Sequence, residues 1–294
     1  MSANALPLES LCETAITAAR AAATYIQSVD RSTIEPQHKS SGSSQASQVV
    51  TAIDFKSEAI IREYLLPVCE QWDIAFVGEE SALTEPEARH SRSYFWCVDP
   101  LDGTQPYIEG QPGYAVSIAL VDRAGTPLIG VVCDPINGEI IHAIRNQGAF
   151  INGVVSLTTN REATHALEVF ADRSFAAEAK QHGLLEKIHH VAQQMHLGEV
   201  KVVYGNGAVK NACQVLRSPA ACYIKLPKPN AGGGSIWDFS ATTCIAKESG
   251  GWCSSIRGQP LDLNRHGSTF MNLQGVLYAS SRILGQSLMD QLSQ

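Results

Sequence analysis

The sequence predicts a mixed fold in which an α+β half is followed by an α/β half. Three observations predict it: an Ala-rich stretch near the N-terminus with apolar residues at helical spacing, a series of short apolar runs separated by turn residues, and a later alternation of strand-like and helix-like runs. The chain has 294 residues. At roughly 150 residues per domain, this length allows one large domain or two closely packed ones.

The first half contains two expected helices and a set of expected strands. Apolar residues recur at helical spacing over residues 6–26, and again from residue 52 or 54 to about residue 70. Between them, residues 37–48 (QHKSSGSSQASQ) are Ser-rich and polar, which is typical of a loop. The strand-like runs, bounded by Gly and Pro turn signals, are residues 74–77, 94–98, 115–121 and 128–133. We interpret this half as two helices followed by an antiparallel sheet.

The pattern changes after Asn152 and Gly153. Strand-like runs alternate from there with helical runs, and this alternation indicates an α/β layer. The strand-like runs are residues 168–171, 199–204 and 222–226, and the helical runs are residues 176–196, 208–216 and 238–248. We expect a boundary within residues 155–165, which divides the chain into an N-terminal domain of residues 1–158 and a C-terminal domain of residues 159–294.

Composition excludes several classes of function. The formal net charge of −7 argues against binding a nucleic-acid polymer, which requires clustered Lys and Arg, although it leaves room for a small anion held through metal ions. No apolar run approaches the roughly 20 residues that span a bilayer, and the N-terminus lacks the pattern of a signal peptide. The eight cysteines are scattered without a CxxC pair, which indicates reduced thiols rather than a zinc site. We therefore expect a soluble cytoplasmic protein.

Acidic residues stand at the ends of four expected elements. They are Asp54 in VVTAID, Glu79 and Glu80 in FVGEES, Asp99 and Asp102 in WCVDPLDGT, and Asp238 in SIWDFSATT. Each segment alone is better explained as a capped turn, a helix N-cap or a solvated surface charge. Four such segments in one chain favour a shared site.

The segment from Asp99 to Thr104 has the chemistry of a metal and anion site. Two carboxylates three residues apart on a turn can hold one or two hard cations, and the carbonyl oxygen of Leu101 can point at the same ion. The N–H groups of Gly103 and Thr104 can face an anion if a helix starts there. This combination favours a site that holds a hard cation beside an anion.

Taken together, VVTAID, FVGEES, WCVDPLDGT and IWDFSATTCIAKESGG resemble the inositol monophosphatase superfamily of Mg²⁺-dependent, Li⁺-sensitive phosphatases, over nearly the whole chain. The resemblance implies a layered αβαβα sandwich of the inositol monophosphatase/fructose-1,6-bisphosphatase type, two or three Mg²⁺ ions, and a homodimer. It implies metal ligation by Glu79, Asp99, Asp102, Asp238 and the Leu101 carbonyl, phosphate binding by the Gly103 and Thr104 amides, and activation of water by the Thr104 hydroxyl and Asp54 with help from Glu80.

The substrate is expected to be a small phosphorylated metabolite. The link from Tyr223 to Trp237 (YIKLPKPNAGGGSIW) resembles that of the 3′(2′),5′-bisphosphate nucleotidases, where a lysine equivalent to Lys210 lies near the second phosphate. A fixed cation there would favour a doubly charged ligand, and Lys225 is a further candidate for substrate binding. Both lysines can equally be solvated residues of a helix and a strand.

Three hypotheses about function stay open. The leading one is a bisphosphate nucleotidase acting on 3′-phosphoadenosine 5′-phosphate. The second is an inositol or sugar monophosphatase, fructose 1,6-bisphosphate included, because the runs GYAVSIALV and GVVCDPINGEIIHAIRNQGAFING are as similar to inositol monophosphatases. The third is a non-catalytic metal-binding protein with the same fold.

Overall fold

The computed structural model describes residues 6–30, 45–82, 87–155 and 164–293. The helices are α1 Leu8–Ser28, α2 Gln45–Trp72, α3 Ala88–Ser91, α4 Thr104–Ile108, α5 Phe175–His182, α6 Leu184–Gln194, α7 Ala208–Arg217, α8 Ile236–Glu248 and α9 Arg282–Leu292. The strands are β1 Ile74–Gly78, β2 Tyr94–Asp102, β3 Ala115–Asp122, β4 Pro127–Cys133, β5 Ile140–Ile144, β6 Gly148–Ile151, β7 Val154–Val155, β8 Ala166–Phe170, β9 Glu199–Val203, β10 Ala221–Lys225, β11 Trp252–Ser254 and β12 Val276–Ala279.

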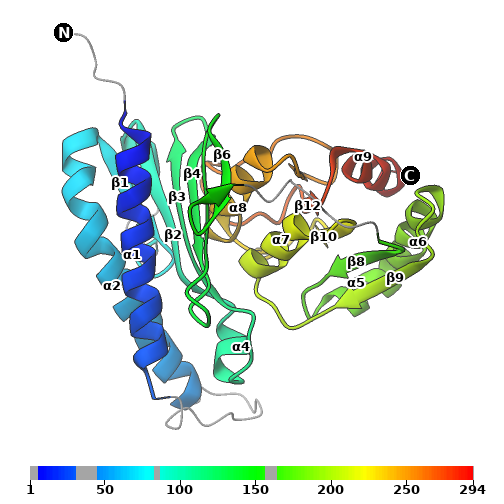
Figure 1. The fold of residues 1–294 in the computed structure, drawn as a ribbon, viewed down its shortest axis with the longest axis horizontal. Helices are drawn as coiled ribbons and strands as arrows, with labels where there is room; N and C mark the ends of the chain where they lie inside the picture. Colours follow the sequence, from blue (N-terminus) through cyan, green and yellow to red (C-terminus); the bar gives the residue numbers. More distant parts are fainter. Residues whose placement is uncertain (1–5, 31–44, 83–86, 156–163, 294) are drawn as a thin grey trace.

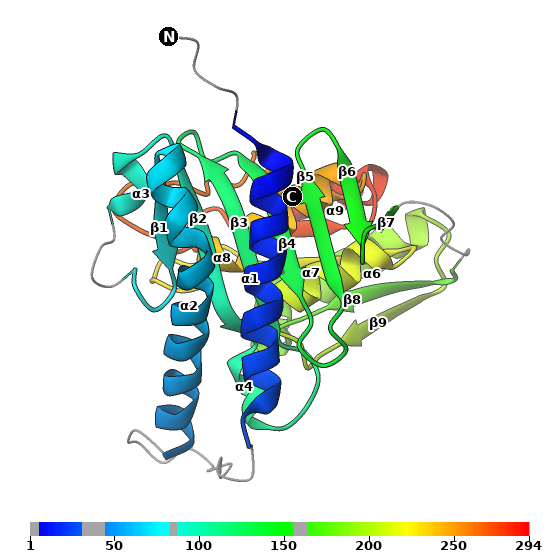
Figure 2. The same ribbon diagram turned by 60° about the vertical axis from the view of Figure 1, so that its left-hand side comes forward.

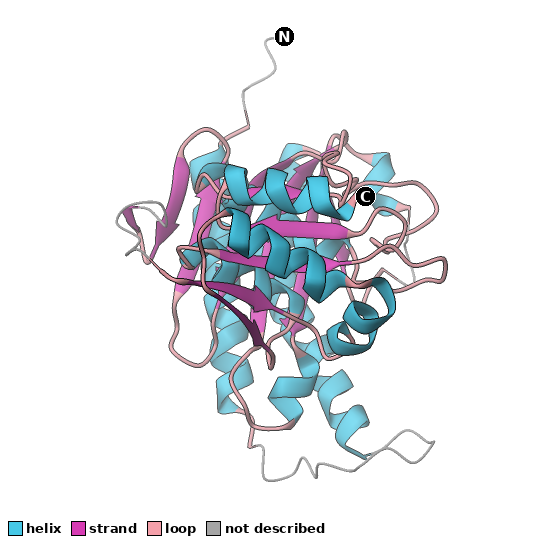
Figure 3. Cartoon of the chain, turned by 90° about the vertical axis from the view of Figure 1, so that its right-hand side faces the viewer, coloured by secondary structure: helices cyan, strands magenta, loops and turns pink. Residues whose placement is uncertain are grey.

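These elements form five layers (Figure 1). Helices α1 and α2 cover one face of the first sheet, and α7 and α8 lie between the two sheets (Figures 1 and 2). Helices α5, α6 and α9 cover the outer face of the second sheet, where Figure 3 shows them in front of its strands. Three clusters of buried apolar side chains hold the layers together. One lies between the first sheet and α1 and α2, one surrounds α7 and α8 between the two sheets, and one lies between the second sheet and α5, α6 and α9. The predicted αβαβα sandwich is confirmed.

The first sheet has its strands in sequence order, from β1 to β7. The prediction of an antiparallel sheet is right for β2 to β7, but β1 runs parallel to β2. In a parallel pair, the connecting chain must run back to the end of the sheet at which the first strand began. The segment between β1 and β2, which contains α3, is long enough to do so. The sequence analysis also missed the short strands β5, β6 and β7.

The second sheet has the order β11-β12-β10-β8-β9. Strands β8, β9 and β10 are parallel and alternate with helices, as predicted, whereas β12 and β11 are antiparallel additions that the sequence analysis missed, along with α9. The helix predicted over residues 176–196 is two helices, because Gly183 takes a left-handed conformation with φ of 60° between α5 and α6.

The start of α2 differs from the prediction, and the proposed domain boundary lies outside the described residues. Helix α2 begins at Gln45, so residues 45–48 are helical although they were predicted as a loop. No Gly or Pro interrupts the chain from Gln45 to Leu66, and this permits the longer helix. Residues 37–44 and the proposed domain boundary between residues 158 and 159 fall outside the described residues, so the division into two domains stays a prediction.

Two expectations from composition can be compared with the structure. Within the described part of the chain, none of the helices combines the length and the apolar character that crossing a membrane requires. All eight cysteines are free thiols, and burial raises the pKa of Cys97 to about 12.

Gly130 on β4 allows α8 to pack closely against the first sheet. A Cβ atom at this position would collide with the carbonyl oxygen of Ala241 and lie 3.0 Å from the Cβ of Cys244. We expect Gly130→Ala to reduce the free energy of unfolding by about 2 kcal/mol because the helix must move away from the sheet. Thermal unfolding would show this as a lower Tm. Gly198→Ala, whose added Cβ would lie 3.8 Å from the carbonyl oxygen of His165, should leave Tm unchanged. Equal values of Tm for the two variants would contradict this account.

Candidate functional site

Strand β2 ends in two buried aspartates, Asp99 and Asp102, which are 1% and 7% exposed. The sequence analysis placed them after the strand, but the strand continues through both. Pro100 has no N–H for the ladder, and the register against β3 shifts between the two aspartates. The N–H of Leu101 donates to Oδ1 of Asp99 at 3.1 Å. This irregularity allows two carboxylates of one strand to serve the same site.

Helix α8 supplies a third carboxylate, Asp238. It lies in the first turn, where its Oδ2 accepts the N–H of Ser235 at 2.7 Å in a capping box. The hydroxyl of Ser117 donates to the carbonyl of Trp237 at 3.2 Å, and Ser117 is the β3 partner of Asp99. This bond fixes the start of α8 beside the end of β2. Carboxylate oxygens of Asp99, Asp102 and Asp238 all lie within 4.8 Å of one another.

Glu79 reaches the same cluster from the parallel strand β1. Its N–H donates to the carbonyl of Val98 at 3.0 Å, which places Glu79 next to the end of β2. Burial and the charge of Asp238 raise the pKa of Glu79 to about 8, and a hydrogen bond with Asp99 opposes this rise. The structure therefore brings together four of the side chains that the sequence analysis proposed as metal ligands.

Burial and mutual repulsion disfavour the charged forms of these carboxylates. Burial and then neighbouring carboxylates raise the pKa of Asp99 well above its usual range, and burial and the charge of Asp238 do the same for Asp102. For Asp238 the rise caused by burial is opposed chiefly by the charge of Lys225. A divalent cation bound among these oxygens would relieve the repulsion, so the donor set fits Mg²⁺.

The end of helix α7 holds Asp102 in place. At the N-terminus of α7, the N–H groups of Ala208 and Val209 donate to its two carboxylate oxygens at 3.1 and 2.9 Å. Helix N-termini commonly bind anions in this way. The sequence analysis missed both residues. Gly207 before a helical run signals a helix start, but no sequence pattern shows which carboxylate that start will meet.

Asp54 and Glu80 lie on the α2 side of the cluster. Burial and the charge of Glu80 raise the pKa of Asp54 to about 8, and the buried Oδ1 of Asp54 has no hydrogen-bond partner among the described residues. The N–H of Glu80 donates to Oε2 of Glu58 at 2.9 Å, which fixes the turn after β1 to helix α2. Gly78 allows this contact because a Cβ atom there would collide with the Glu58 carboxylate. The sequence analysis missed Glu58.

Gly103 and Thr104 begin the short helix α4, as the sequence analysis expected. Gly103 caps the helix in a left-handed conformation with φ of 85°. The exposed Thr104 donates from its hydroxyl to the carbonyl of Leu101 at 3.4 Å, so this hydroxyl lies beside the proposed carbonyl ligand. The first N–H groups of a helix have no partner within it and remain available to an oxyanion.

The two candidate substrate lysines are both engaged in ion pairs. Nζ of Lys210 lies 2.7 Å from Asp134, with both side chains mostly buried. Nζ of Lys225 lies 2.5 Å from Asp172, at the C-terminal end of the second sheet. Lys225 is electrostatically linked to the carboxylate cluster through Asp238, whereas the side chain of Lys210 is directed to Asp134.

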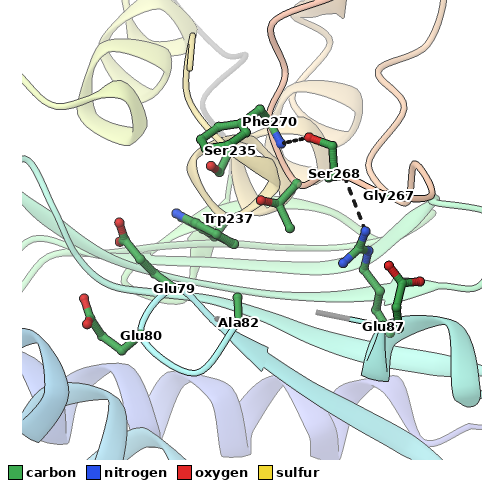
Figure 4. A pocket seen from close by; sticks show the side chains of 11 residues that line it. Glu79, Glu80, Ala82, Glu87, Ser235, Trp237, Gly267, Ser268 and Phe270 are labelled. Carbon is green, nitrogen blue, oxygen red and sulfur yellow. Dashed lines mark hydrogen bonds between the residues drawn. The ribbon is translucent and has the colours of Figure 1, made fainter. Parts of the chain in front are cut away.

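Glu79 and Glu80 also line a pocket of about 660 Å³ (Figure 4). Trp237 and Phe270 contribute aromatic side chains to it, and Ser235 adds a hydroxyl. A volume of this size accommodates a small organic ligand. Through Glu79, the carboxylate cluster therefore borders a cavity of metabolite size.

A second group of possible metal ligands consists of Glu87, His90 and His266. The two imidazole rings stack at 3.9 Å between centroids, with an angle of 16° between their planes. In stacked, nearly parallel rings, the nitrogen lone pairs of His90 and His266 point in parallel planes and do not converge on one metal position. Burial, and then the charges of Arg89 and His266, lower the pKa of His90. This arrangement suits a cation less well than the aspartate cluster does.

Comparison with known proteins gives a consistent result. A model of the inositol monophosphatase family matches residues 7–290 of the chain. The inositol monophosphatase of Mesembryanthemum crystallinum is 29% identical over 272 residues, which cover 90% of this chain and 91% of the plant protein. The 3′(2′),5′-bisphosphate nucleotidase CysQ of Shigella flexneri is 30% identical over 214 residues, which cover 72% of this chain and 78% of that protein. A match to Nus factor SuhB of Xylella fastidiosa, 27% identical, covers 63% of this chain and 62% of its own length, less than two thirds.

Solved structures show the same fold. The inositol monophosphatase of Anabaena (Nostoc) sp. PCC 7120 superposes with a TM-score of 0.69 at 24% sequence identity, covering 98% of this chain and 97% of that one.

Proposed function

The chain belongs to the inositol monophosphatase family, whose members are phosphatases, and we propose that it hydrolyses a phosphate monoester of a small metabolite with Mg²⁺ held by its carboxylate cluster. The observation that carries this proposal is the meeting of Asp99, Asp102 and Asp238 within 4.8 Å. Asp99 and Asp102 belong to β2, whereas Asp238 comes from α8, far along the sequence. Glu79, hydrogen-bonded to Asp99, and the Leu101 carbonyl complete the proposed ligand set.

Mg²⁺ bound to these oxygens would supply positive charge to the phosphate and to the leaving oxygen. The chain's own residues then position the reactants, which is the larger part of phosphoryl transfer. We propose that the N–H groups of Gly103 and Thr104 donate to the phosphate oxygens. The hydroxyl of Thr104 and the carboxylate of Asp54, assisted by Glu80, would orient the attacking water and accept its proton. The water oxygen bonds to phosphorus as the ester bond breaks, and the leaving oxygen takes up a proton.

For the substrate we propose a 3′(2′),5′-bisphosphate nucleotide, with 3′-phosphoadenosine 5′-phosphate as the first candidate. The long link between Tyr223 and Trp237 supports it, and so does the 30% identity with a protein named as such a nucleotidase. Lys225 would bind the phosphate near the metal. For Lys210 to meet a second phosphate, its ion pair with Asp134 would have to open.

The second candidate is an inositol or sugar phosphate. The similarity to the plant inositol monophosphatase favours it, because that match covers a larger share of both chains than the match to the nucleotidase. From the family resemblance we further propose two or three bound Mg²⁺ ions, a homodimer, and inhibition by Li⁺. From composition we propose a cytoplasmic location.

An assay of phosphate release with Mg²⁺ distinguishes these substrates. We expect kcat/KM for 3′-phosphoadenosine 5′-phosphate to exceed the value for inositol 1-phosphate by about tenfold or more, because only the nucleotide carries a second phosphate for the Lys210 ammonium. Fructose 1,6-bisphosphate, which also has two phosphates, tests whether the nucleoside itself contributes. A higher value for inositol 1-phosphate would replace the leading substrate by the second candidate. Absence of phosphate release from all three would favour the non-catalytic hypothesis.

A further inference from the structure

Asp172 stands beside Lys225 at the end of the second sheet. Strands β8 and β10 are parallel, with Phe170 paired to Tyr223. Two residues further along each strand, Asp172 comes beside Lys225. The C-terminal ends of parallel strands meet at one edge of a sheet, which explains why these two residues are neighbours.

Three donors converge on the Asp172 carboxylate. Nζ of Lys225 lies within 2.5 Å of Oδ2, the Tyr223 hydroxyl donates to both oxygens at 3.0 and 3.3 Å, and Nδ2 of Asn211 donates at 3.2 Å. Asn211 in turn accepts a hydrogen bond from Asn206 at 3.3 Å. A carboxylate with this many donors holds each of them in a defined position.

Lys225 also lies near the start of α8, which carries Asp238. Its Nζ is 6.0 Å from the ring of Phe239, the residue after Asp238. Its charge is the largest influence that lowers the pKa of Asp238. After burial, the charges of Asp172 and Asp238 both raise the pKa of Tyr223. The Lys225 ammonium therefore interacts with two carboxylates, those of Asp172 and Asp238.

We propose that Asp172 is a positioning residue that holds the ammonium of Lys225 away from Asp238 and so keeps Asp238 available to Mg²⁺. An ammonium and a divalent cation compete for the same carboxylate oxygens, and they also repel each other directly. While it is paired with Asp172, the Lys225 ammonium stays at the edge of the cluster, where it can bind a substrate phosphate. This inference rests on the proposed function, because it takes Asp238 as a metal ligand.

Two substitutions that break the same ion pair should change Mg²⁺ affinity in opposite directions. Asp172→Asn releases Lys225 toward Asp238, so we expect about tenfold weaker Mg²⁺ binding. Lys225→Met removes the competing charge, so we expect Mg²⁺ binding about threefold tighter than in the wild type, together with a higher KM for the phosphate ester. A merely structural ion pair would give changes of the same sign in both variants.

Affinity is measured on metal-free protein without substrate. The readout is the rise in Tm over a series of Mg²⁺ concentrations c, which yields Kd because the stabilisation grows with ln(1 + c/Kd). The double variant Asp172→Asn/Lys225→Met should bind Mg²⁺ at least as tightly as the wild type. Glu178→Gln serves as the matched control, because it breaks a 2.6 Å ion pair with Lys228 in the same half of the chain. We expect it to leave Mg²⁺ affinity unchanged.

Wild-type Mg²⁺ affinity in Asp172→Asn, or a double variant as weak as this single one, would overturn the proposal. Should Asp172→Asn fail to fold, Tyr223→Phe removes another donor to Asp172 and should weaken Mg²⁺ binding by a smaller factor. Unchanged affinity in Tyr223→Phe would also count against the proposal.

Asp99→Asn tests the proposed metal site separately from the proposed role of Asp172. If it too leaves Mg²⁺ affinity unchanged, the proposed metal site itself is wrong. If it abolishes binding while Asp172→Asn has no effect, the role of Asp172 alone is wrong.

Discussion

Asp99→Asn is expected to lower kcat/KM by about 10³-fold while leaving the protein folded. The amide has nearly the shape of the carboxylate, so the packing around this buried position is retained, but it lacks the charge that binds Mg²⁺. Asp238→Asn should lose activity to a similar extent. Its remaining side-chain oxygen can still accept the N–H of Ser235, so the start of α8 should persist.

In the absence of metal, Asp99→Asn should not destabilise the protein, although it removes activity. Burial and the neighbouring charges of Glu79, Asp102 and Asp238 oppose ionisation of Asp99. Removing one charge from such a cluster relieves repulsion, so the Tm of metal-free Asp99→Asn should equal or exceed that of the metal-free wild type. A variant that lost activity only because it unfolded would show a lower Tm instead.

Both quantities are measured on the same samples, as phosphate release with Mg²⁺ and as thermal unfolding after removal of metal. Asp73→Asn is the control, because Asp73 forms an exposed ion pair with Arg92 outside the cluster. It should retain wild-type activity. Full activity in Asp99→Asn or in Asp238→Asn would show that these carboxylates do not form the active site.

Gly207→Ala is expected to lower kcat/KM by about 10²-fold, although the substitution adds a single methyl group. Gly207 has φ of −68° and ψ of 173°, a conformation that alanine adopts without strain. The cost is therefore a collision: the new Cβ would lie 2.7 Å from Cγ of Asp102 and 2.7 Å from Cα of Gly103. Either Asp102 or the N-terminus of α7 must move, and both belong to the proposed site.

The effect of Gly207→Ala is measured as kcat/KM and as the Mg²⁺ concentration for half-maximal rate. We expect the latter to rise because Asp102 is displaced. Gly198→Ala, in a loop where the added Cβ would lie 3.8 Å from the carbonyl oxygen of His165, is the matched control and should behave as the wild type. If Gly207→Ala had wild-type activity and Mg²⁺ dependence, the close approach of α7 to Asp102 would not matter for function.

Local patterns predicted most of the elements that carry the site. The apolar run before Asp99 predicted a strand, and the Gly103–Thr104 pair predicted the start of α4, because strand period and turn chemistry are local properties. The short strands β5 to β7 and β11 to β12 were missed. Their runs are too brief to show a period, and their formation depends on neighbours in the sheet.

The support around the acidic residues was also beyond the reach of sequence patterns. Ser117 fixes α8 to β3, Glu58 fixes the turn after β1, and the Ala208 N–H fixes Asp102. Each of these contacts joins residues that are separated by 22 to 120 positions. Hydroxyl, carboxylate and backbone groups of these kinds occur throughout the chain, so nothing in the sequence marks the ones that meet.

The sequence by itself determined which residues can do the chemistry, since the donor atoms of Glu79, Asp99, Asp102 and Asp238 are fixed by residue type. Only the tertiary structure decided that they meet, because this requires β1 to lie parallel to β2 and α8 to start beside the end of β2. It also decided the surroundings of Lys210 and Lys225, each of which lies against an aspartate from another element. Charges act through space, so the partner of a buried lysine follows from packing and not from its neighbours along the chain.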